Sequence, residues 1–376
     1  MKRNIPIYYA AVLIIMSNSA YAQSSVTLFG AIDSGLMYQS TSASSYSPRA
    51  SNNGSVFQYK DAGMYASYWG LRGSEDIGGG YKINLKMMSA FNSGSGKFGI
   101  SGTAGTTSIF DEQATVGISG PFGTFDAGRQ FTPMMYAMQD TDVRGGLYWG
   151  SILTAWISMN QVAGWSATSS NLPIGALFDS NALVYRSPKF YGASFALEYA
   201  PGGVAGQAQG GSRESAVIYY SNYGLNVAAV YYNAHDTNPT PTTVPTGLDN
   251  NRFYYVGVKY QYRRLSVSAS YGLGKNPSNS ALYDIEMISG GLGYQFSPFF
   301  SFTSGYYYLR DRNNRGNHSS EYVVGGAYHI SKTTTAYVQV GYVDNKGTMN
   351  QTIGYAAPVA PGVSTTEAMI GIRHSF

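Results

Sequence analysis

The sequence predicts an all-β fold: a closed, antiparallel transmembrane β-barrel of 16 strands with long extracellular loops. Apolar and polar residues alternate with a period of two over segments of about ten residues, as in strands that face lipid on one side and water on the other. The connectors between these segments are short and long in turn. The chain contains 34 Tyr, 17 Phe and 46 Gly, while only 12% of its residues are charged. Tyr is favoured at membrane–water interfaces, and Gly with aromatic residues in short strands is typical of barrels.

The N-terminal segment predicts export. Lys2 and Arg3 form a short positive region, and residues 5–16 are mostly apolar. Ala20-Tyr21-Ala22 then places small residues at the −3 and −1 positions of a cleavage site. A membrane anchor needs about 20 apolar residues, so this run is too short. Two units are therefore expected, a signal peptide at 1–22 and a barrel domain at 23–376.

Charge and cysteine content exclude several classes of protein. The formal net charge is +4, and the expected signal peptide holds two positive charges and no acid, so the remainder is near +2. That charge is too weak and dispersed for nucleic-acid binding. The chain has no cysteine, which excludes disulfides and thiolate metal sites. After residue 22 no stretch is long and apolar enough for a membrane helix, so a place in a membrane requires a closed barrel.

The alternation predicts sixteen strands, an even number, as expected when both chain ends lie on one side of the membrane. The predicted strands are 26–38, 66–76, 81–92, 111–120, 124–131, 181–188, 192–200, 214–222, 225–235, 252–262, 265–274, 283–295, 299–311, 320–330, 334–344 and 366–376. Short turns alternate with long polar loops, which are predicted at 39–65, 93–110, 132–180, 201–213, 236–251, 275–282, 312–319 and 345–365.

The phase of the alternation indicates which side chains face the lumen. In the strand predicted at 81–92, Lys82 and Lys86 share one face. A Lys that faces lipid at mid-depth costs about 2–4 kcal/mol, so this face is expected to be wet. Three more side chains are turned inward by the same reasoning: Tyr68, Arg72 and Arg186. The strand at 252–262 does not reveal its phase.

Runs of aromatic residues lie near strand ends. They are Tyr219-Tyr220, Tyr231-Tyr232, Phe253-Tyr254-Tyr255 and Tyr306-Tyr307-Tyr308. We expect them to form girdles at the two membrane interfaces. The alternative is an aromatic track inside the lumen that binds sugars.

Several blocks resemble the general trimeric porins of β-proteobacteria, as found in Neisseria, Bordetella and Burkholderia. The most specific is residues 69–80, WGLRGSEDIGGG, which resembles the second strand and first turn of that family. The others are 24–33, SSVTLFGAID; 122–124, FGT; 128–130, GRQ; 181–190, NALVYRSPKF; and 371–376, GIRHSF. Together they span the chain after the expected signal peptide.

The resemblance implies an outer-membrane location, a homotrimer and a third loop folded into the lumen as a constriction. It also implies passive diffusion of ions and small hydrophilic solutes, contact with outer-membrane lipid and lipopolysaccharide, and recognition of Phe376 by the barrel-insertion machinery. The connector at 132–180 is by far the longest, and a loop of that length is normally functional. Pro133 is expected to begin a short helix within it.

In such porins, acids of the third loop oppose basic side chains on the barrel wall, and such charges tune which ions pass. The wall candidates are Arg72, Lys82, Lys86 and Arg186, and the loop candidates are Asp140, Asp142 and Arg144. Arg129 is expected to anchor the base of the loop. The chain departs from the family at Tyr68, Glu112 and Val184, where basic residues are usual. These departures predict a weakened preference for anions.

The third loop is unusually apolar, with Leu147, Tyr148, Trp149, Ile152, Leu153, Trp156 and Ile157. These residues either fix the loop against the wall or form an apolar strip in the pore. The second possibility supports an alternative function, a channel of the same fold that prefers aromatic or amphiphilic solutes.

No catalytic or cofactor motif stands out. The four histidines lack metal-ligand spacing, and residues 92–97 lack the spacing of a phosphate loop. His235-Asp236 is the only pair that suggests an outer-membrane hydrolase, which is the most remote alternative. We therefore expect a passive channel without catalysis, metal or cofactor.

Overall fold

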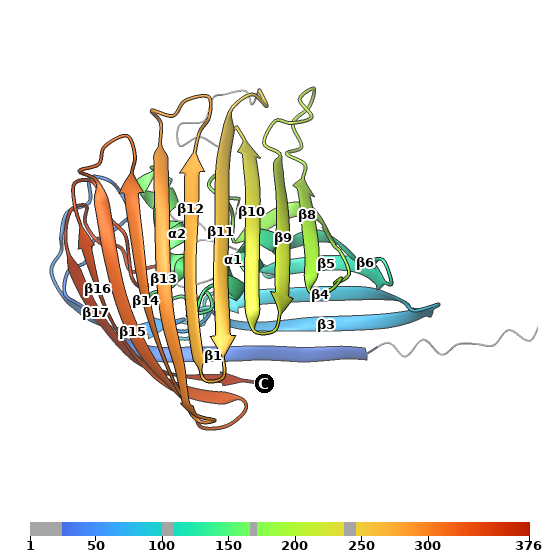
Figure 1. Cartoon of the computed structure of the whole chain (residues 1–376), viewed down its shortest axis with the longest axis horizontal. Coiled ribbons are helices and arrows are strands. Elements are labelled where there is room, and N and C mark those ends of the chain that lie inside the picture. The colour runs from blue at the N-terminus through green and yellow to red at the C-terminus, as the bar shows by residue number, and fades with distance from the viewer. Residues whose placement is uncertain (1–24, 100–107, 166–170, 237–245) are drawn as a thin grey trace, which may run out of the picture.

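The computed structural model describes residues 25–99, 108–165, 171–236 and 246–376; the signal peptide expected at 1–22 lies outside them. Seventeen strands form one antiparallel sheet that closes around two helices (Figure 1). The strands are β1 (Ser25–Gln39), β2 (Val56–Asp61), β3 (Ser67–Gly78), β4 (Tyr81–Phe91), β5 (Gln113–Gly120), β6 (Gly123–Phe131), β7 (Phe178–Arg186), β8 (Ala193–Ala200), β9 (Arg213–Asn222), β10 (Leu225–His235), β11 (Asn250–Tyr262), β12 (Leu265–Lys275), β13 (Asp284–Ser297), β14 (Phe300–Asp311), β15 (His318–His329), β16 (Thr334–Asn345) and β17 (Thr365–Ser375). The helices are α1 (Pro133–Thr141) and α2 (Ile152–Val162).

The barrel closes at β1, which is paired along both edges. One edge pairs with β17, from Ala31 opposite Ser375 to Gln39 opposite Glu367. The other edge is shared, because its first half pairs with β3 and its second half with β2. β2 and β3 therefore fill one position in the wall. The predicted sixteen-stranded barrel is confirmed, with one additional strand.

That additional strand lies in the segment predicted as a long loop, 39–65, and this part of the prediction is wrong. β2 has only six residues, too few for a clear alternation, and it forms because β1 offers it an unpaired edge. Between β2 and β3, residues 62–66 leave the wall and turn into the barrel. We call them the inward bulge. Asp33 holds it, since its Oδ2 accepts the N–H groups of Met64 at 2.8 Å and Tyr65 at 3.0 Å.

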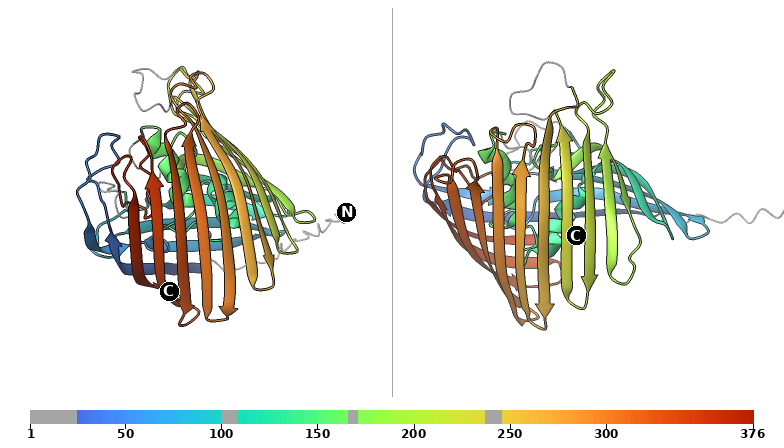
Figure 2. Two further views of the ribbon diagram at one scale, coloured as in Figure 1. Left: turned by 60° about the vertical axis from the view of Figure 1, so that its left-hand side comes forward. Right: turned by 45° about the horizontal axis from the view of Figure 1, so that its top comes forward.

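The connectors alternate in length, as predicted. The turns between β9 and β10 and between β11 and β12 lie at the bottom of Figure 1, and the long loops lie at the opposite end. One of the tight turns depends on Gly224, whose φ is +79° and where a Cβ would lie 2.3 Å from the carbonyl oxygen of Gln261. The long connector between β6 and β7 carries both helices and runs inside the ring of strands (Figure 2).

The helix predicted to begin at Pro133 is confirmed as α1, whose N-cap Thr132 accepts a hydrogen bond from the Met135 N–H. The second helix, α2, was not predicted; it begins with a capping box formed by Ser151 and Thr154. Its residues are buried as far as Gln161, and it contacts β13 and β14. Neither helix in the described part of the chain is long and apolar enough to cross a membrane.

The apolar third loop fixes itself against the wall, as the first of the two interpretations expected. Trp149, Ile152, Leu153 and Trp156 are fully buried in one core. The Trp156 indole N–H donates a hydrogen bond of 2.6 Å to the Ile174 carbonyl. The core also takes inward aromatic residues of the wall: Tyr232, Phe253, Tyr255 and Tyr307.

This core corrects the girdle interpretation for the inward members of three of the four aromatic runs. Adjacent strand residues point to opposite faces, so Tyr307 is buried inside, while the ring of its neighbour Tyr306 lies 5.0 Å from the exposed Tyr322 of β15. The strand at 252–262, for which the sequence did not reveal the inward face, alternates in the same way. Phe253 and Tyr255 are buried inside the barrel, and Val256 and Val258 are exposed. The inward members do not form a free aromatic track, because the loop helices cover them.

Candidate pore constriction

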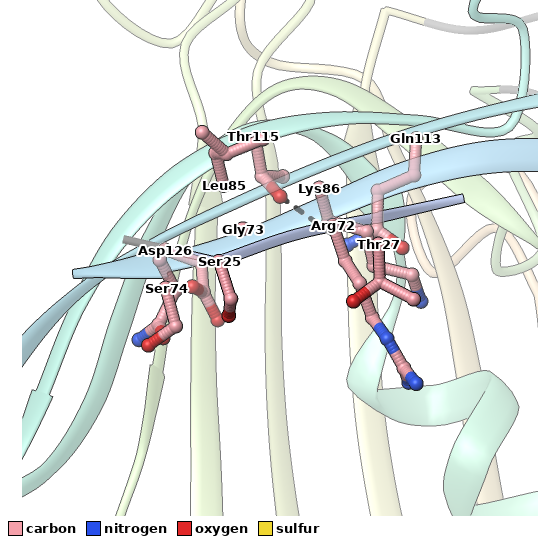
Figure 3. Close-up of a pocket in the computed structure, with 11 residues that line it drawn as sticks. Ser25, Thr27, Arg72, Gly73, Ser74, Leu85, Lys86, Gln113, Thr115 and Asp126 are labelled. Carbon is pink, nitrogen blue, oxygen red and sulfur yellow. Dashed lines mark hydrogen bonds between the residues drawn. The ribbon is translucent and has the colours of Figure 1, made fainter. Parts of the chain in front are cut away.

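The lumen contains four hollows that are connected through shared lining residues. The wall hollow, of about 390 Å³, is lined by residues of β1, β3, β4, β5 and β6, among them Arg72, Lys86 and Asp126 (Figure 3). The central hollow, of about 320 Å³, lies between the wall, the inward bulge and the third loop. Two others lie beside α1 and near β14–β16, with volumes of about 430 Å³ and 220 Å³. We call them the α1 hollow and the β14 hollow.

The central hollow adjoins the other three. Lys86 lines both it and the wall hollow. Tyr136 lines both it and the α1 hollow, and Tyr65 lines both it and the β14 hollow. The central hollow is bounded by wall residues on one side and by α1 and the inward bulge on the other.

Two cations stand opposite each other on the wall. Arg72 of β3 pairs in register with Lys86 of β4, and both side chains line the wall hollow. Like charges directly across two strands are destabilising. Among the described residues neither has a carboxylate within salt-bridge distance. Both instead lie over the Phe29 ring, at 5.5 Å for Arg72 and 5.8 Å for Lys86.

The other wall candidates differ in their surroundings. Arg186 forms an ion pair of 2.8 Å with Asp126 and lines the α1 hollow. Tyr68 lines the central hollow. Lys82 is exposed near the turn between β3 and β4 and lines none of the four hollows.

Glu112 and Val184 are buried. Glu112 is 1% exposed, lines the central hollow, and its Oε1 has no hydrogen-bond partner among the described residues. Val184 is fully buried in a small cluster with Ala182 and Ala200. Arg129 donates hydrogen bonds to the Asp111 carbonyl at 2.5 Å and to Ser180 Oγ at 2.8 Å, which ties both ends of the third loop together.

Of the three loop candidates, Asp140 and Arg144 line hollows of the lumen, and Asp140 is the exposed one. It is exposed on α1 and lines the α1 hollow with Tyr136. Partial burial raises the pKa of the Asp140 carboxyl above its ordinary value, and the positive charge of Lys259 works against that rise.

Asp142 and Arg144 are almost fully buried, although Arg144 lines the β14 hollow. Asp142 is 3% exposed, and its carboxylate accepts the Ile152 N–H at 2.8 Å and the Tyr307 hydroxyl at 2.9 Å. Ile152 is the first residue of α2, and a carboxylate is stabilised at a helix N-terminus. Asp142 therefore holds the start of that helix.

Arg144 is 2% exposed and clamps the loop to the wall. Its guanidinium donates to Thr303 Oγ1 at 2.9 Å and to Gln339 Oε1 at 2.5 Å, on β14 and β16. It also donates to the carbonyls of Trp149, at 3.1 Å, and Gly150. The sequence did not reveal this role, because the partners come from segments nearly 200 positions apart.

Some lining residues were missed. Arg373 of β17 lines the central hollow; its guanidinium lies 5.4 Å from the Tyr65 ring and 5.7 Å from the Tyr68 ring. Alternation could have found it, since Ile370 and Ile372 are exposed on the outer face of the same strand. Lys189 and Tyr136, in connectors, had no such signal.

Across the four hollows basic residues outnumber acids. Six basic residues line them: Arg72, Lys86, Arg144, Arg186, Lys189 and Arg373. Three acidic residues do so: Glu112, Asp126 and Asp140.

The surroundings of His235 do not support a catalytic role for this residue. Its Nδ1 lies 3.0 Å from the Gly247 carbonyl, and its Nε2 lies 3.1 Å from the Asn233 amide of β10 and 3.7 Å from the Glu214 carboxylate of β9, so both ring nitrogens have structural partners. Asp236 accepts the Gly247 N–H instead of contacting the imidazole. Within the described ranges no three His, Asp or Glu side chains cluster as metal ligands would.

A closed barrel whose lumen is narrowed by an internal loop defines a pore-forming outer-membrane protein. The family model described as "Gram-negative porin" matches residues 10–348. The chain belongs to this family, and it is an outer-membrane porin whose functional site is the channel through the barrel.

Individual relatives agree with this assignment. The chain is 26% identical to "Outer membrane porin protein 32" of Delftia acidovorans, over 98% of both chains. It is 26% identical to "Major outer membrane protein P.IB" of Neisseria meningitidis, over 94% of this chain and 95% of the relative. The solved "Anion-selective porin from Comamonas acidovorans" superposes with a TM-score of 0.74 at 22% identity, over 94% of this chain and all of that one.

Proposed function

We propose that the channel passes ions and small hydrophilic solutes by passive diffusion, with a weak preference for anions. The observation that carries this proposal is the surplus of basic over acidic residues along the four hollows. Within the described ranges, no carboxylate lies within 4.0 Å of Arg72 or Lys86. Fixed charges that line a narrow aqueous path tune which ion passes. The solved structure named "Anion-selective porin from Comamonas acidovorans" shares the fold. The selectivity stated in that name has the same sign as the preference that we propose.

The sequence alone predicted a weakened anion preference, from the missing basic residues at positions 68, 112 and 184. Positions 112 and 184 are buried, so their lack of positive charge alters the aqueous path less than expected. Arg373 and Lys189 add positive charge that the sequence analysis did not count. The balance supports a preference that is weak but favours anions.

The reversal potential in a planar bilayer tests this proposal. The purified protein is inserted in a bilayer with a tenfold KCl gradient across it. We expect a reversal potential whose sign shows that chloride passes faster than potassium, with a chloride-to-potassium permeability ratio of about two to five. A reversal potential of the opposite sign would overturn the charge interpretation. Failure to conduct ions at all would overturn the channel itself.

We further propose a homotrimer embedded in outer-membrane lipid and lipopolysaccharide. The outer face of β1 supports it, because its apolar side chains at Val26, Leu28, Ile32 and Leu36 are exposed and need lipid or another subunit to cover them. Unboiled protein should migrate on a denaturing gel as a compact oligomer and shift on heating. Migration as a monomer before heating would contradict the trimer. Recognition of Phe376 by the insertion machinery stays a prediction.

The proposal includes no catalytic activity and no cofactor. Two of the relatives named above are called porins in their names, those of Delftia and Comamonas, and the histidine geometry among the described residues offers no general base beside a nucleophile. Ester and peptide substrates should therefore remain intact with the purified protein, and measurable turnover would contradict this part of the proposal.

A further inference from the structure

We propose that the central hollow is a binding site for small hydroxylated aromatic carboxylates. This inference rests on the proposed function, because the ligand must reach the hollow through a conducting channel. It goes beyond charge preference, since it assigns a ring, a carboxylate and a phenolic hydroxyl to separate parts of one site.

Six of the fourteen residues that line the central hollow are aromatic. They come from three places: Phe29, Tyr68 and Phe131 from the wall, Tyr65 from the inward bulge, and Tyr136 and Tyr148 from the third loop. The rings of Tyr65 and Tyr148 meet edge to face at 6.4 Å. A cavity of about 150 Å³ can hold benzene, and this hollow encloses about 320 Å³. A single aromatic ring therefore fits between side chains that favour stacking.

Lys86 is the group available to a carboxylate. Its ammonium has no carboxylate within 4.0 Å in the described part of the chain, and it lies 5.8 Å from the centre of the Phe29 ring. Arg373 is occupied, because it donates to the carbonyls of Tyr65 and Ala66 and lies 3.7 Å from an oxygen of Asp33. Because Lys86 lines the wall hollow as well, a ligand meets it on the way in.

Free hydroxyl donors lie beside that cation. The hydroxyls of Tyr68 and Tyr136 line the hollow without a hydrogen bond to any described residue. Each can donate to a carboxylate oxygen, and charge-assisted hydrogen bonds of this kind are the stronger ones.

Glu112 supplies the acceptor for a phenolic hydroxyl. It is 1% exposed, it lines the hollow, and its Oε1 has no partner among the residues that the structure describes. A buried unpaired acceptor is costly, and a ligand donor would satisfy it. The Glu112 N–H donates to the Met88 carbonyl at 3.3 Å, and Met88 lies two positions from Lys86 on β4. Two strand residues span roughly 7 Å, so the acceptor and the cation belong to the same stretch of the wall.

Glu112 also explains why the hydroxyl is part of the proposed ligand. A carboxylate ligand that carries no hydroxyl would leave the Glu112 Oε1 unpaired. Sites built to pair a buried polar group discriminate strongly against analogues that lack the matching group. The arrangement therefore favours 4-hydroxybenzoate over benzoate, and either over an aliphatic carboxylate.

The test is block of the single-channel KCl current by four added sodium salts: 4-hydroxybenzoate, benzoate, cyclohexanecarboxylate and acetate. We expect half-block by 4-hydroxybenzoate at a concentration at least tenfold lower than by cyclohexanecarboxylate or acetate, with benzoate between. Equal block by all four salts would overturn the proposal while leaving the channel intact. A protein without KCl current would instead refute the proposed function.

Three variants separate the contacts. Lys86→Gln should weaken block by both aromatic carboxylates about tenfold, while Lys82→Gln, the same charge change on the same strand outside the hollow, should leave all four half-block concentrations unchanged. Tyr68→Leu should narrow the difference between aromatic and aliphatic salts. Glu112→Gln should reduce the preference for 4-hydroxybenzoate over benzoate, and its fold is checked by heat-dependent gel migration. Undiminished selectivity in the Lys86 and Tyr68 variants would refute the site even if the Glu112 variant failed to fold.

Discussion

Two sides of the barrel interior differ in what fills them. Along β3–β8 the inner face carries charged and polar side chains beside the wall, central and α1 hollows. Along β13–β17, α2 and the connector 346–364 pack against much of the inner face, and the β14 hollow occupies a smaller part of it. Figures 1 and 2 show the helices inside the ring of strands. We call these the open side and the filled side.

The filled side is built like the interior of a soluble protein. The third loop forms a β-bridge between Trp149 and Gly354, and the Gly150 N–H donates to the Ile353 carbonyl at 2.8 Å. Gln351 donates to Glu321 of β15 at 2.6 Å. The two sides therefore have different roles in one barrel. The filled side is a stable framework that holds the constriction loop, and the residues of the open side line the aqueous path and determine its selectivity.

The largest expected effect is on the filled side. Trp156→Ala should lower the free energy of unfolding by about 3–5 kcal/mol, the usual cost of removing a buried aromatic side chain. It also removes the hydrogen bond to the Ile174 carbonyl. Urea titration in detergent or lipid measures the change. Leu248→Ala, at an exposed loop position, is the control and should shift stability by no more than about 0.5 kcal/mol. Equal effects of the two changes would contradict the comparison.

Arg144→Met should come next, because it removes the clamp between the loop and β14 and β16. We expect a loss of about 1.5–3 kcal/mol, the range for hydrogen bonds to a charged group, together with a noisier single-channel current. Arg144→Lys keeps the charge but not the fork of donors, so it should recover only part of both properties. A quiet current and unchanged stability in the Met variant would show that the loop is held elsewhere.

On the open side, charge removal should change selectivity without a large effect on stability. The double variant Arg72→Gln, Lys86→Gln removes two of the six basic residues and should lower the chloride-to-potassium permeability ratio twofold to threefold. Relief of the repulsion between the two cations should leave stability equal or slightly higher. Reversal potentials measure the ratio, with Lys82→Gln as the matched control. An unchanged permeability ratio in the double variant would show that these two cations do not contribute to ion selectivity.

The smallest expected effect is a pH dependence at Asp140. Burial raises the pKa of this carboxyl, so on acidification it takes up its proton at a higher pH than an ordinary Asp does. Protonation removes one negative charge from the α1 hollow, so the anion preference should rise as the pH falls. Asp140→Asn should show the higher preference at neutral pH and less change on acidification. The same pH dependence in the Asn variant would assign it to another group.

The sequence predicted the parts of the molecule that depend on local periodicity. Two-residue alternation located the sixteen wall positions. It also predicted that Arg72 and Lys86 point inward, because the outer face of each strand contacts lipid and must be apolar. It missed α2 because that helix is buried on almost every side, and a helix without a polar face has no amphipathic period. It placed Asp142 and Arg144 in open water because their partners, such as Tyr307 and Gln339, are brought near only by closure of the barrel.

The division into an open and a filled side is tested most directly by cysteine accessibility, because the native chain has no cysteine. Thr115 lines the wall hollow, whereas Ser319 is fully buried on the filled side and donates to Gln351. We predict that Thr115→Cys reacts with a water-soluble thiosulfonate in the open channel and that the current falls, while Ser319→Cys stays unmodified under the same conditions. Equal reaction rates at the two cysteines, with equal loss of current, would contradict the account.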